Sequence, residues 1–272
     1  MTGTPNTARP LALITGASAG IGVSFARAFA ARGYDLALVA RRLDRLEKVG
    51  AEISAAHGVT VIPIQGDLSK VDAHVPVMAI LAEQGRAVEA LVNNAGYSLP
   101  KTYTAYPWEQ QRDFVMTLVM AVCGMTHAVL PGMLARGRGR IISVGSMAGL
   151  SPGGAGHTLY PAAKSFVDKF SRSLDAEVRD KGVKVTCVHP GFTESEFQVA
   201  NGMDAVIKEN PRGMMMSADE VVRQTLEAND TGRVICTPGF VNTLGAALLK
   251  YLPDGVTAAL IRREAEKYRM PD

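Results

Sequence analysis

The chain has 272 residues, 47% of them apolar, and a formal net charge of +3 at neutral pH. This composition is typical of a globular protein with a sizeable core, and because no block of like charges occurs it argues against nucleic-acid and membrane-surface partners. The three cysteines and five histidines show no paired or metal-ligand spacing, and no stretch reaches about eighteen apolar residues, so we expect no disulfide framework, no metal and no membrane span, in a reducing, cytoplasmic compartment.

Short apolar runs alternate with helical periodicity along the chain. After a polar tail over residues 1–9, which we expect to be loose, continuous apolar runs predict strands that are buried on both faces. These runs are 11–15, 35–40, 59–65, 88–92, 140–146, 183–190 and 233–238. Helical periodicity between them, as at 22–33 and 43–58, predicts an α/β fold. We expect one domain with a doubly wound parallel sheet and helices on both faces.

The first predicted strand runs into the glycine-rich turn "ITGASAGIG". Gly16, Gly20 and Gly22 would let the backbone approach a pyrophosphate, with Ile21 as a further contact, and the helix that the turn opens would offer it free N–H groups. The alternative is a tight turn that binds nothing. The position at the first strand-to-helix junction of a doubly wound pattern favours dinucleotide binding.

Two arginines at the end of the second predicted strand indicate which dinucleotide binds. An acidic residue about twenty positions after the glycines would bind the ribose of NAD. Asp35 lies near that distance, but it begins the strand, at the edge opposite the cofactor. Arg41 and Arg42 end the strand and would pair with a 2′-phosphate, with Ser18 as a further hydroxyl donor. We therefore expect NADP(H) in preference to NAD(H); the alternative for Arg42 is an ordinary surface arginine.

The third and fourth predicted strands also end in polar groups. Asp67, in "GDLS", would face the adenine amino group and Leu68 would supply a backbone N–H, although Asp67 could equally cap a helix. In "LVNNAG" the strand ends at Asn94, Ala95 and Gly96, which we expect beside the cofactor unless they form only a turn. Both ends belong to the carboxyl edge of the sheet, where ligands bind in open α/β folds.

Three polar side chains are expected to converge near the end of the fifth predicted strand. Ser146 ends that strand, and in "LYPAAK" Tyr160 and Lys164 stand one turn apart on one helical face. Reduction of a carbonyl needs a hydride donor and a proton donor. Tyr160 would give the proton, and its pKa, roughly 10 when unperturbed, would be lowered by the Lys164 ammonium and by a nicotinamide cation. Ser146 would orient the substrate oxygen.

These motifs together resemble the short-chain dehydrogenase/reductase family, in its single-domain branch with Y-x-x-x-K. The resemblance covers residues 10 to about 195 and rests on "TGASAGIG", "NNAG", Ser146, "YPAAK" and "HPGFT", in the family's order. It implies a Rossmann-type sheet of seven strands and a nicotinamide cofactor. It also implies Tyr160 as general acid/base, Lys164 as its partner and holder of the cofactor ribose, and Ser146 as substrate holder. The resemblance further implies a contact with the carboxamide side of the nicotinamide, made by Pro190, Gly191 and Thr193.

The resemblance includes one departure and two segments whose role stays open. The family usually has an asparagine, on the helix before the fifth strand, that helps hold a water of the proton relay; here that position falls on Leu118. Residues 193–216 correspond to a substrate lid, whose phenylalanine and methionines either shape an apolar pocket or pack on the body of the fold. The C-terminal extension, residues 241–272, is predicted as two helices that break at Pro253. Relatives form homodimers or homotetramers, and we expect the same here.

The chain is therefore expected to be an NADP(H)-dependent oxidoreductase that interconverts an apolar ketone or aldehyde and an alcohol. Because Leu118 replaces the relay asparagine, a catalytically idle NADP-binding sensor or scaffold is the alternative. An epimerase or dehydratase is a third possibility, but that branch of the family usually carries a longer substrate domain than this length allows.

Overall fold

A seven-stranded parallel sheet forms the centre of the computed structural model, which describes residues 9–194, 215–253 and 255–259. The strand order is β3-β2-β1-β4-β5-β6-β9. The strands are β1 Leu11–Thr15, β2 Asp35–Ala40, β3 Val61–Gln65, β4 Val88–Asn93, β5 Gly139–Val144, β6 Val183–Val188 and β9 Ile235–Cys236. Each predicted apolar run overlaps one of them, and the predicted doubly wound α/β fold with seven strands is confirmed.

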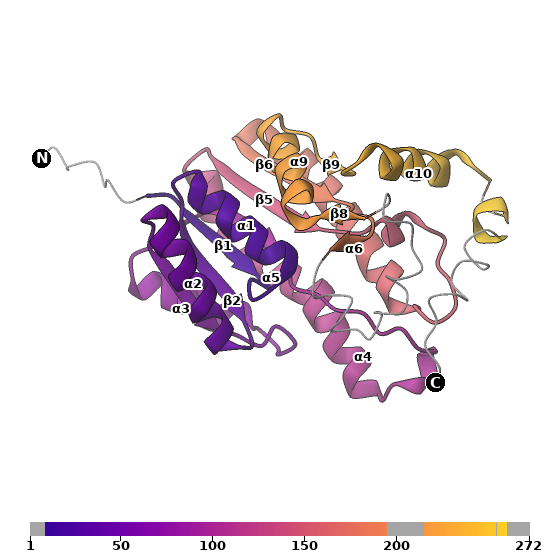
Figure 1. Cartoon of the computed structure of the whole chain (residues 1–272), viewed down its shortest axis with the longest axis horizontal. Coiled ribbons are helices and arrows are strands. Elements are labelled where there is room, and N and C mark those ends of the chain that lie inside the picture. The colour runs from indigo at the N-terminus through magenta and orange to yellow at the C-terminus, as the bar shows by residue number, and fades with distance from the viewer. Residues whose placement is uncertain (1–8, 195–214, 254, 260–272) are drawn as a thin grey trace, which may run out of the picture.

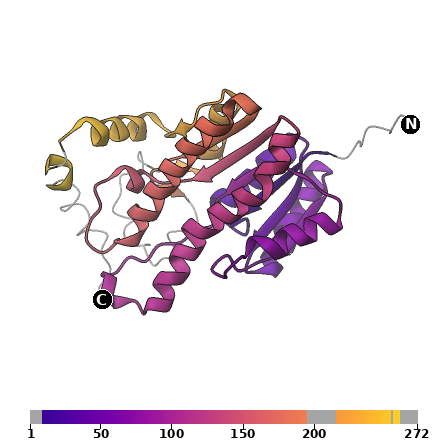
Figure 2. The ribbon, with the colours of Figure 1, turned by 180° about the vertical axis from the view of Figure 1, so that it is seen from behind.

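Helices cover both faces of the sheet. In Figure 1, α1 and α2 lie over the face toward the viewer, and Figure 2 shows the long helices α5 and α6 crossing the opposite face. The helices are α1 Gly20–Ala31, α2 Leu43–His57, α3 His74–Glu83, α4 Trp108–Val115, α5 Ala121–Ala135, α6 Leu159–Val178, α9 Ala218–Asp230 and α10 Phe240–Tyr251. A π-helical segment, Met116–Met120, joins α4 to α5.

Each face of the sheet has its own apolar core, because strand side chains alternate between the two faces. In β1, Ala12 and Ile14 pack with α1, α2 and α9, whereas Leu11 and Leu13 pack with α3, α5 and α6. All four residues are at most 1% exposed. Since burial of each leucine or isoleucine contributes about 1.5–3 kcal/mol, both cores stabilise the strands whose ends carry the polar motifs.

The direction of the strand connections reverses at β1. From β1 the chain moves outward to β2 and β3, and it then returns to place β4 on the other side of β1. In open α/β sheets a crevice for ligands forms outside the carboxyl ends of the strands at such a point. The glycine-rich turn after β1 and the "NAG" segment after β4 both lie there.

One helical run in the described residues, Trp108–Ala135, is long and apolar enough by length and composition to cross a membrane. Met125 and Val129 of this run are at most 4% exposed and pack in the core beneath β4 and β5. This part of the run therefore packs against the sheet. The run does not contain about eighteen consecutive apolar residues, because Thr126 and His127 interrupt it.

A small two-stranded sheet stands at the base of the predicted lid. β7, Thr193–Glu194, pairs in parallel with β8, Met216–Ser217. The rest of the lid prediction, together with residues 1–8 of the predicted tail and residues 260–272 of the C-terminal extension, lies outside the described residues. The first of the two predicted C-terminal helices corresponds to α10, which ends shortly before Pro253.

Candidate active site

A cavity of about 890 Å³ opens along the carboxyl ends of the strands. Residues that follow β1, β2, β3, β4, β5 and β6 all contribute to its wall, so the cavity extends across the point where the strand connections reverse. The predicted site residues that line it are Gly16, Ser18, Gly20, Ile21, Arg41, Arg42, Asp67, Leu68, Asn94, Ala95, Gly96, Ser146, Tyr160, Lys164, Pro190, Gly191 and Thr193. Gly22 is the predicted contact that lies outside this lining.

The glycine-rich turn leaves space for a ligand because it carries no side chain where β1 and β4 end. Gly16 has a φ of +66°, and a Cβ there would lie 2.8 Å from the Cα of Ala95. A Cβ on Gly22 would overlap the carbonyl oxygen of Gly16. Gly22 therefore allows α1 to pack against the turn, and its predicted contact with the cofactor stays a prediction.

Hydrogen bonds from the end of β4 hold this turn in place. The side-chain amide of Asn94 donates to the carbonyl oxygens of Thr15 and Gly16, at 3.0 Å each. The Thr15 hydroxyl accepts the backbone N–H groups of Asn94 and Ala95, at 3.0 and 3.1 Å. A glycine-rich turn that is held in this way, next to the N-terminus of α1, fits a pyrophosphate.

We expect Gly22→Ala to lower the free energy of unfolding by about 3 kcal/mol, because its methyl group meets a backbone oxygen that cannot move aside. Dinucleotide binding should be lost with it. Urea unfolding and titration with NADPH measure the two effects. The control is Gly33→Ala, at a φ of +81° with open space around it, which should cost about 1 kcal/mol and leave binding unchanged. An unchanged free energy of unfolding in Gly22→Ala would contradict the packing role.

Two cationic side chains stand at the β2 end of the cavity. Arg41 and Arg42 line it together with Ser18, and Nη2 of Arg42 donates to the Ser18 hydroxyl at 3.4 Å. Asp35 lies at the opposite end of β2, is 5% exposed and forms a 2.8 Å ion pair with Arg86. As the sequence predicted, the carboxylate of Asp35 is remote from the cavity, and positive charge occupies the end of β2.

Asp67 borders the cavity and also stabilises its own turn. Its Oδ1 accepts the backbone N–H of Ser69 at 3.1 Å and the Ser69 hydroxyl at 2.8 Å. Although burial opposes ionisation, these hydrogen bonds lower the pKa of Asp67. Asp67 therefore borders the cavity, as predicted, whereas the alternative of a helix cap is wrong, because α3 begins only at His74 and Asp67 holds the turn before it.

Ser146, Tyr160 and Lys164 meet at the β5 end of the cavity. The Ser146 hydroxyl accepts the N–H of Ala148 at 3.1 Å and is also hydrogen-bonded to the Tyr160 phenol. Tyr160 and Lys164 are one turn apart in α6, and Nζ of Lys164 lies 5.7 Å from the centre of the Tyr160 ring. The same Nζ donates to the carbonyl of Val144 at 2.6 Å, which connects α6 to the end of β5.

Burial moves both titrating groups of this trio toward their neutral forms. It raises the pKa of Tyr160, against the opposing hydrogen bond with Ser146, and it lowers the pKa of Lys164 to about 8. For the protein's own groups the direction is opposite to the lowering expected from Lys164, and the part of that expectation that depends on a nicotinamide cation stays a prediction. At Tyr160 the cost of burying a phenolate outweighs the favourable contact with Ser146. The protonated phenol that results is the form that can donate a proton.

Leu118 fills the position where the family resemblance leads one to expect an asparagine. Its side chain is 1% exposed and packs with Phe114 and Ala163. Leu118 and Lys164 both lie close to Gly96. A Cβ built on Gly96 would be 3.6 Å from the Cγ of Leu118 and 3.8 Å from the Nζ of Lys164. Leu118 also stands in the π-helical segment, a distortion found frequently at functional sites. An apolar group therefore borders Lys164 here, in place of a side-chain amide.

The far wall of the cavity contains residues that the sequence analysis missed. Tyr97 lines it, and burial together with the charge of Asp113 raises the pKa of this tyrosine, against a hydrogen bond with Thr117. This wall also includes His157, Val241 and Asn242. Tyr97 had a signal in the sequence, its place directly after "NNAG", whereas the other residues come from segments whose packing no local pattern defines.

The chain is similar to known proteins along most of its length. The family model described as short chain dehydrogenase matches residues 10–204. An uncharacterized oxidoreductase from Myxococcus xanthus (strain DK1622) is 39% identical over 190 residues, which are 70% of this chain and 74% of that protein. The very-long-chain 3-oxoacyl-CoA reductase of Anas platyrhynchos is 38% identical over 191 residues, which are 68% of this chain and 60% of the relative's length.

A solved structure shows the same arrangement of the chain. The short-chain dehydrogenase from Sphingobium yanoikuyae in complex with NADPH matches with a TM-score of 0.77 at 30% identity, over 90% of this chain and 96% of that one. The sheet, the cavity at its carboxyl edge and these similarities define an oxidoreductase with a Rossmann-type fold. The chain belongs to the short-chain dehydrogenase/reductase family.

Proposed function

We propose that this protein is an NADP(H)-dependent oxidoreductase that interconverts a ketone or aldehyde and the corresponding alcohol. One observation carries the proposal: the Tyr160 phenol, the Lys164 ammonium and the Ser146 hydroxyl converge on a cavity whose other wall is a glycine cradle. A proton donor and a dinucleotide cradle in one cavity are what carbonyl reduction requires. Similarity to a relative named as a 3-oxoacyl-CoA reductase supports the carbonyl as substrate.

The roles of the three polar residues follow from their positions. The bound nicotinamide supplies the hydride in reduction and accepts it in oxidation. Ser146 donates a hydrogen bond to the substrate oxygen and holds it beside Tyr160, which gives its phenolic proton to the developing alkoxide. In the reverse direction the Tyr160 phenolate takes that proton. Lys164 stabilises the phenolate by its charge and is held by its N–H bond to the carbonyl of Val144. It would also hold the cofactor ribose.

The preference for NADP(H) is supported by Arg41, Arg42 and Ser18 at the end of β2. We expect Arg41→Asp to weaken NADPH binding by about 30-fold, since one charge-assisted contact of about 2 kcal/mol is lost, and NADH binding by less than about threefold. Binding titrations with both dinucleotides measure this. Lys48→Asp, an exposed change of equal charge on α2 away from the cavity, should affect neither. Equal weakening of NADPH and NADH in Arg41→Asp would contradict a contact with the 2′-phosphate.

A substrate panel tests the activity itself. Ketones, aldehydes and alcohols of increasing apolar size are offered with NADPH or NADP, and the absorbance of NADPH is followed. We expect turnover with at least one apolar carbonyl compound, because aliphatic and aromatic groups such as Val241 and Tyr97 line the cavity. Tight NADPH binding without turnover across the whole panel would contradict the proposal and favour an idle NADP-binding protein, for which Leu118 is the argument.

A further inference from the structure

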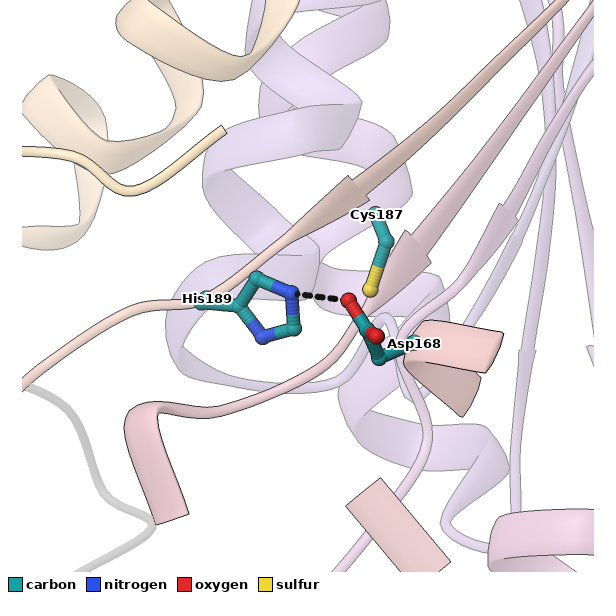
Figure 3. A group of neighbouring side chains, drawn as sticks. All are labelled: Asp168, Cys187 and His189. Atoms are coloured by element: carbon teal, nitrogen blue, oxygen red, sulfur yellow. Dashed lines mark hydrogen bonds and ion pairs between the residues drawn. The ribbon is translucent and has the colours of Figure 1, made fainter. Parts of the chain in front are cut away.

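A buried histidine and a buried aspartate connect the segment that carries Ser146 to the helix that carries Tyr160 and Lys164. His189 follows β6 and is 0% exposed, and Asp168 lies in α6, one turn after Lys164, at 3% exposed. Nε2 of the His189 ring is 2.9 Å from Oδ1 of Asp168, as Figure 3 shows, and Nδ1 is 3.1 Å from the carbonyl oxygen of Ser146. The ring therefore links the two parts of the catalytic trio.

The hydrogen bonds show that both ring nitrogens of His189 carry protons. The Ser146 carbonyl can only accept, so Nδ1 must donate. Both oxygens of Asp168 accept from Nε of Arg172, at 3.1 and 2.9 Å. A carboxylate in that position is ionised and can also only accept, so Nε2 must donate as well. His189 is therefore an imidazolium, and its charge is balanced by Asp168.

The titration of the pair agrees with this geometry. Burial opposes both charges. The hydrogen bond with Asp168 and the neighbouring Cys187 nevertheless raise the pKa of His189 to about 9, and the bonds from His189 and Arg172 lower the pKa of Asp168 to about 2. The contribution of His189 to stability is therefore complete below its ordinary pKa of 6.5 and is lost as the pH rises through about 9. That of Asp168 is present above pH 3.8 and lost as the pH falls through about 2. The other charged or titratable groups near the ring are Lys169, Arg172 and Cys187.

A metal ion does not explain this cluster. The potential ligand atoms of Asp168, Cys187 and His189 lie within 4.8 Å of one another, and Figure 3 shows the three side chains converging. However, Nε2 of His189 uses its proton in the bond to Asp168, and both carboxylate oxygens already accept from Arg172. A protonated ring nitrogen has no lone pair for coordination.

The His189 ring completes a set of contacts along the Ser146 backbone. Before Ser146, the backbone N–H of Gly145 donates to the carbonyl of Val188 at 2.8 Å. After it, the N–H of Met147 donates to the carbonyl of Pro190 at 3.1 Å. Between these two bonds, the His189 side chain reaches the Ser146 carbonyl itself. The position of Ser146 is therefore set by β6, and the bond to Asp168 sets β6 relative to α6.

We propose that Asp168 and His189 are positioning residues of the reaction, which fix the separation of Ser146 from Tyr160 by joining the ends of β5 and β6 to α6. This inference rests on the proposed function. Lys164 joins the same elements from the cavity side through the carbonyl of Val144. The Lys164–Val144 bond and the His189–Asp168 bond together hold Ser146 and Tyr160 in place. This matters for the rate, because a misplacement of about 1 Å between reacting groups can cost as much as 10²-fold.

A second aspartate of α6 provides a matched control. Asp175 is 5% exposed and pairs with Arg179 four residues later, as Asp168 pairs with Arg172. It lies about two turns further along the helix from the active site. In the part of the chain that the structure describes, its ion pair is with Arg179 and no histidine bonds to it. Removing Asp175 therefore deletes a comparable buried carboxylate without a link to Ser146.

The two aspartates are compared in steady-state kinetics of carbonyl reduction. We expect Asp168→Ala to lower kcat by about tenfold or more with the KM for NADPH within about threefold, and Asp175→Ala to change kcat by less than about twofold. Asp168→Asn should recover kcat to within about threefold of the wild type, because its amide can still hydrogen-bond to a neutral His189 ring. Equal losses in the two alanine variants, or no recovery with asparagine, would overturn the proposal.

A measurement on the unmodified protein keeps the proposal testable if Asp168→Ala does not fold. Nitrogen NMR of the His189 ring at pH 7 should show both nitrogens protonated, with loss of a proton only near pH 9. A single ring proton at pH 7, as in a neutral tautomer or a metal-bound imidazole, would overturn the proposal. A wild-type protein that turns over no substrate would reject the proposed function instead, and the count of ring protons would still test the Asp168–His189 pair.

Discussion

Tyr160→Phe is expected to lower kcat for carbonyl reduction by on the order of 10³ and to leave the dissociation constant of NADPH within about threefold of the wild type. Phenylalanine keeps the packing of the ring with Leu118 and Phe114 but has no proton to give. Ser146 can still hold the substrate oxygen, so binding persists while the proton-transfer step is lost. Steady-state kinetics and a fluorescence titration with NADPH give the two numbers.

Tyr97→Phe is the matched control for this experiment. Tyr97 also lines the cavity, and burial raises its pKa as it does that of Tyr160, but its phenol bonds to Thr117 and not to Ser146. We expect its kcat to stay within about fivefold of the wild type, since no reacting proton passes through it. Equal losses in the two variants would mean that cavity polarity, and not proton donation, is being measured. Unchanged turnover in Tyr160→Phe would remove the general-acid role from this residue.

The sheet could be predicted from the sequence because its strands are buried on both faces. In β1 every residue is apolar or small whichever face it meets, so a continuous run marks the whole strand. The predicted ends of the strands were less accurate than the predicted strands themselves, for a physical reason. Val59 is 3% exposed and belongs to the core, yet β3 begins at Val61, because apolar content reports burial and not where the hydrogen-bonded ladder starts.

The cavity lining could be predicted where residues follow a strand, since the carboxyl ends of parallel strands meet at one edge. Arg41 and Asn94 are of this kind. The Asp168–His189 pair could not be predicted, because its members are 21 residues apart on different elements and only tertiary packing brings them together. The pKa of Tyr160 depends in the same way on burial, which the spacing of Tyr160 and Lys164 does not report.

Lys164→Met is expected to lower kcat by on the order of 10² while it raises the free energy of unfolding of the cofactor-free protein by about 2 kcal/mol at pH 7. Lys164 is 6% exposed, and burial lowers its pKa from 10.5 to about 8. A depression of this size corresponds to about 3 kcal/mol against the ammonium in the folded state. Methionine removes the charge but also the hydrogen bond to Val144, which is worth about 1 kcal/mol. Urea unfolding and steady-state kinetics measure the two effects.

The pH dependence of the free energy of unfolding tests whether the buried charge of Lys164 causes the higher stability of Lys164→Met. Because the pKa of Lys164 is lower in the folded protein than in the unfolded chain, the unfolded chain binds more protons between about pH 8 and pH 10.5. The stability of the wild type therefore rises relative to Lys164→Met across this interval. The advantage of the variant should be full below about pH 8 and should disappear above about pH 10.5.

Lys48→Met serves as the control, since its side chain is exposed on α2 and lies outside the cavity. Its stability and its kcat should both stay close to the wild type, within about 0.5 kcal/mol and twofold. If Lys164→Met instead destabilises the protein at pH 7, contacts of the ammonium outweigh its burial and Lys164 is a structural residue. If it stabilises the protein and loses activity, packing does not explain a lysine at this position. Its proposed roles beside the Tyr160 phenol and the cofactor ribose then explain it, because both need a cation there even at a cost to the fold.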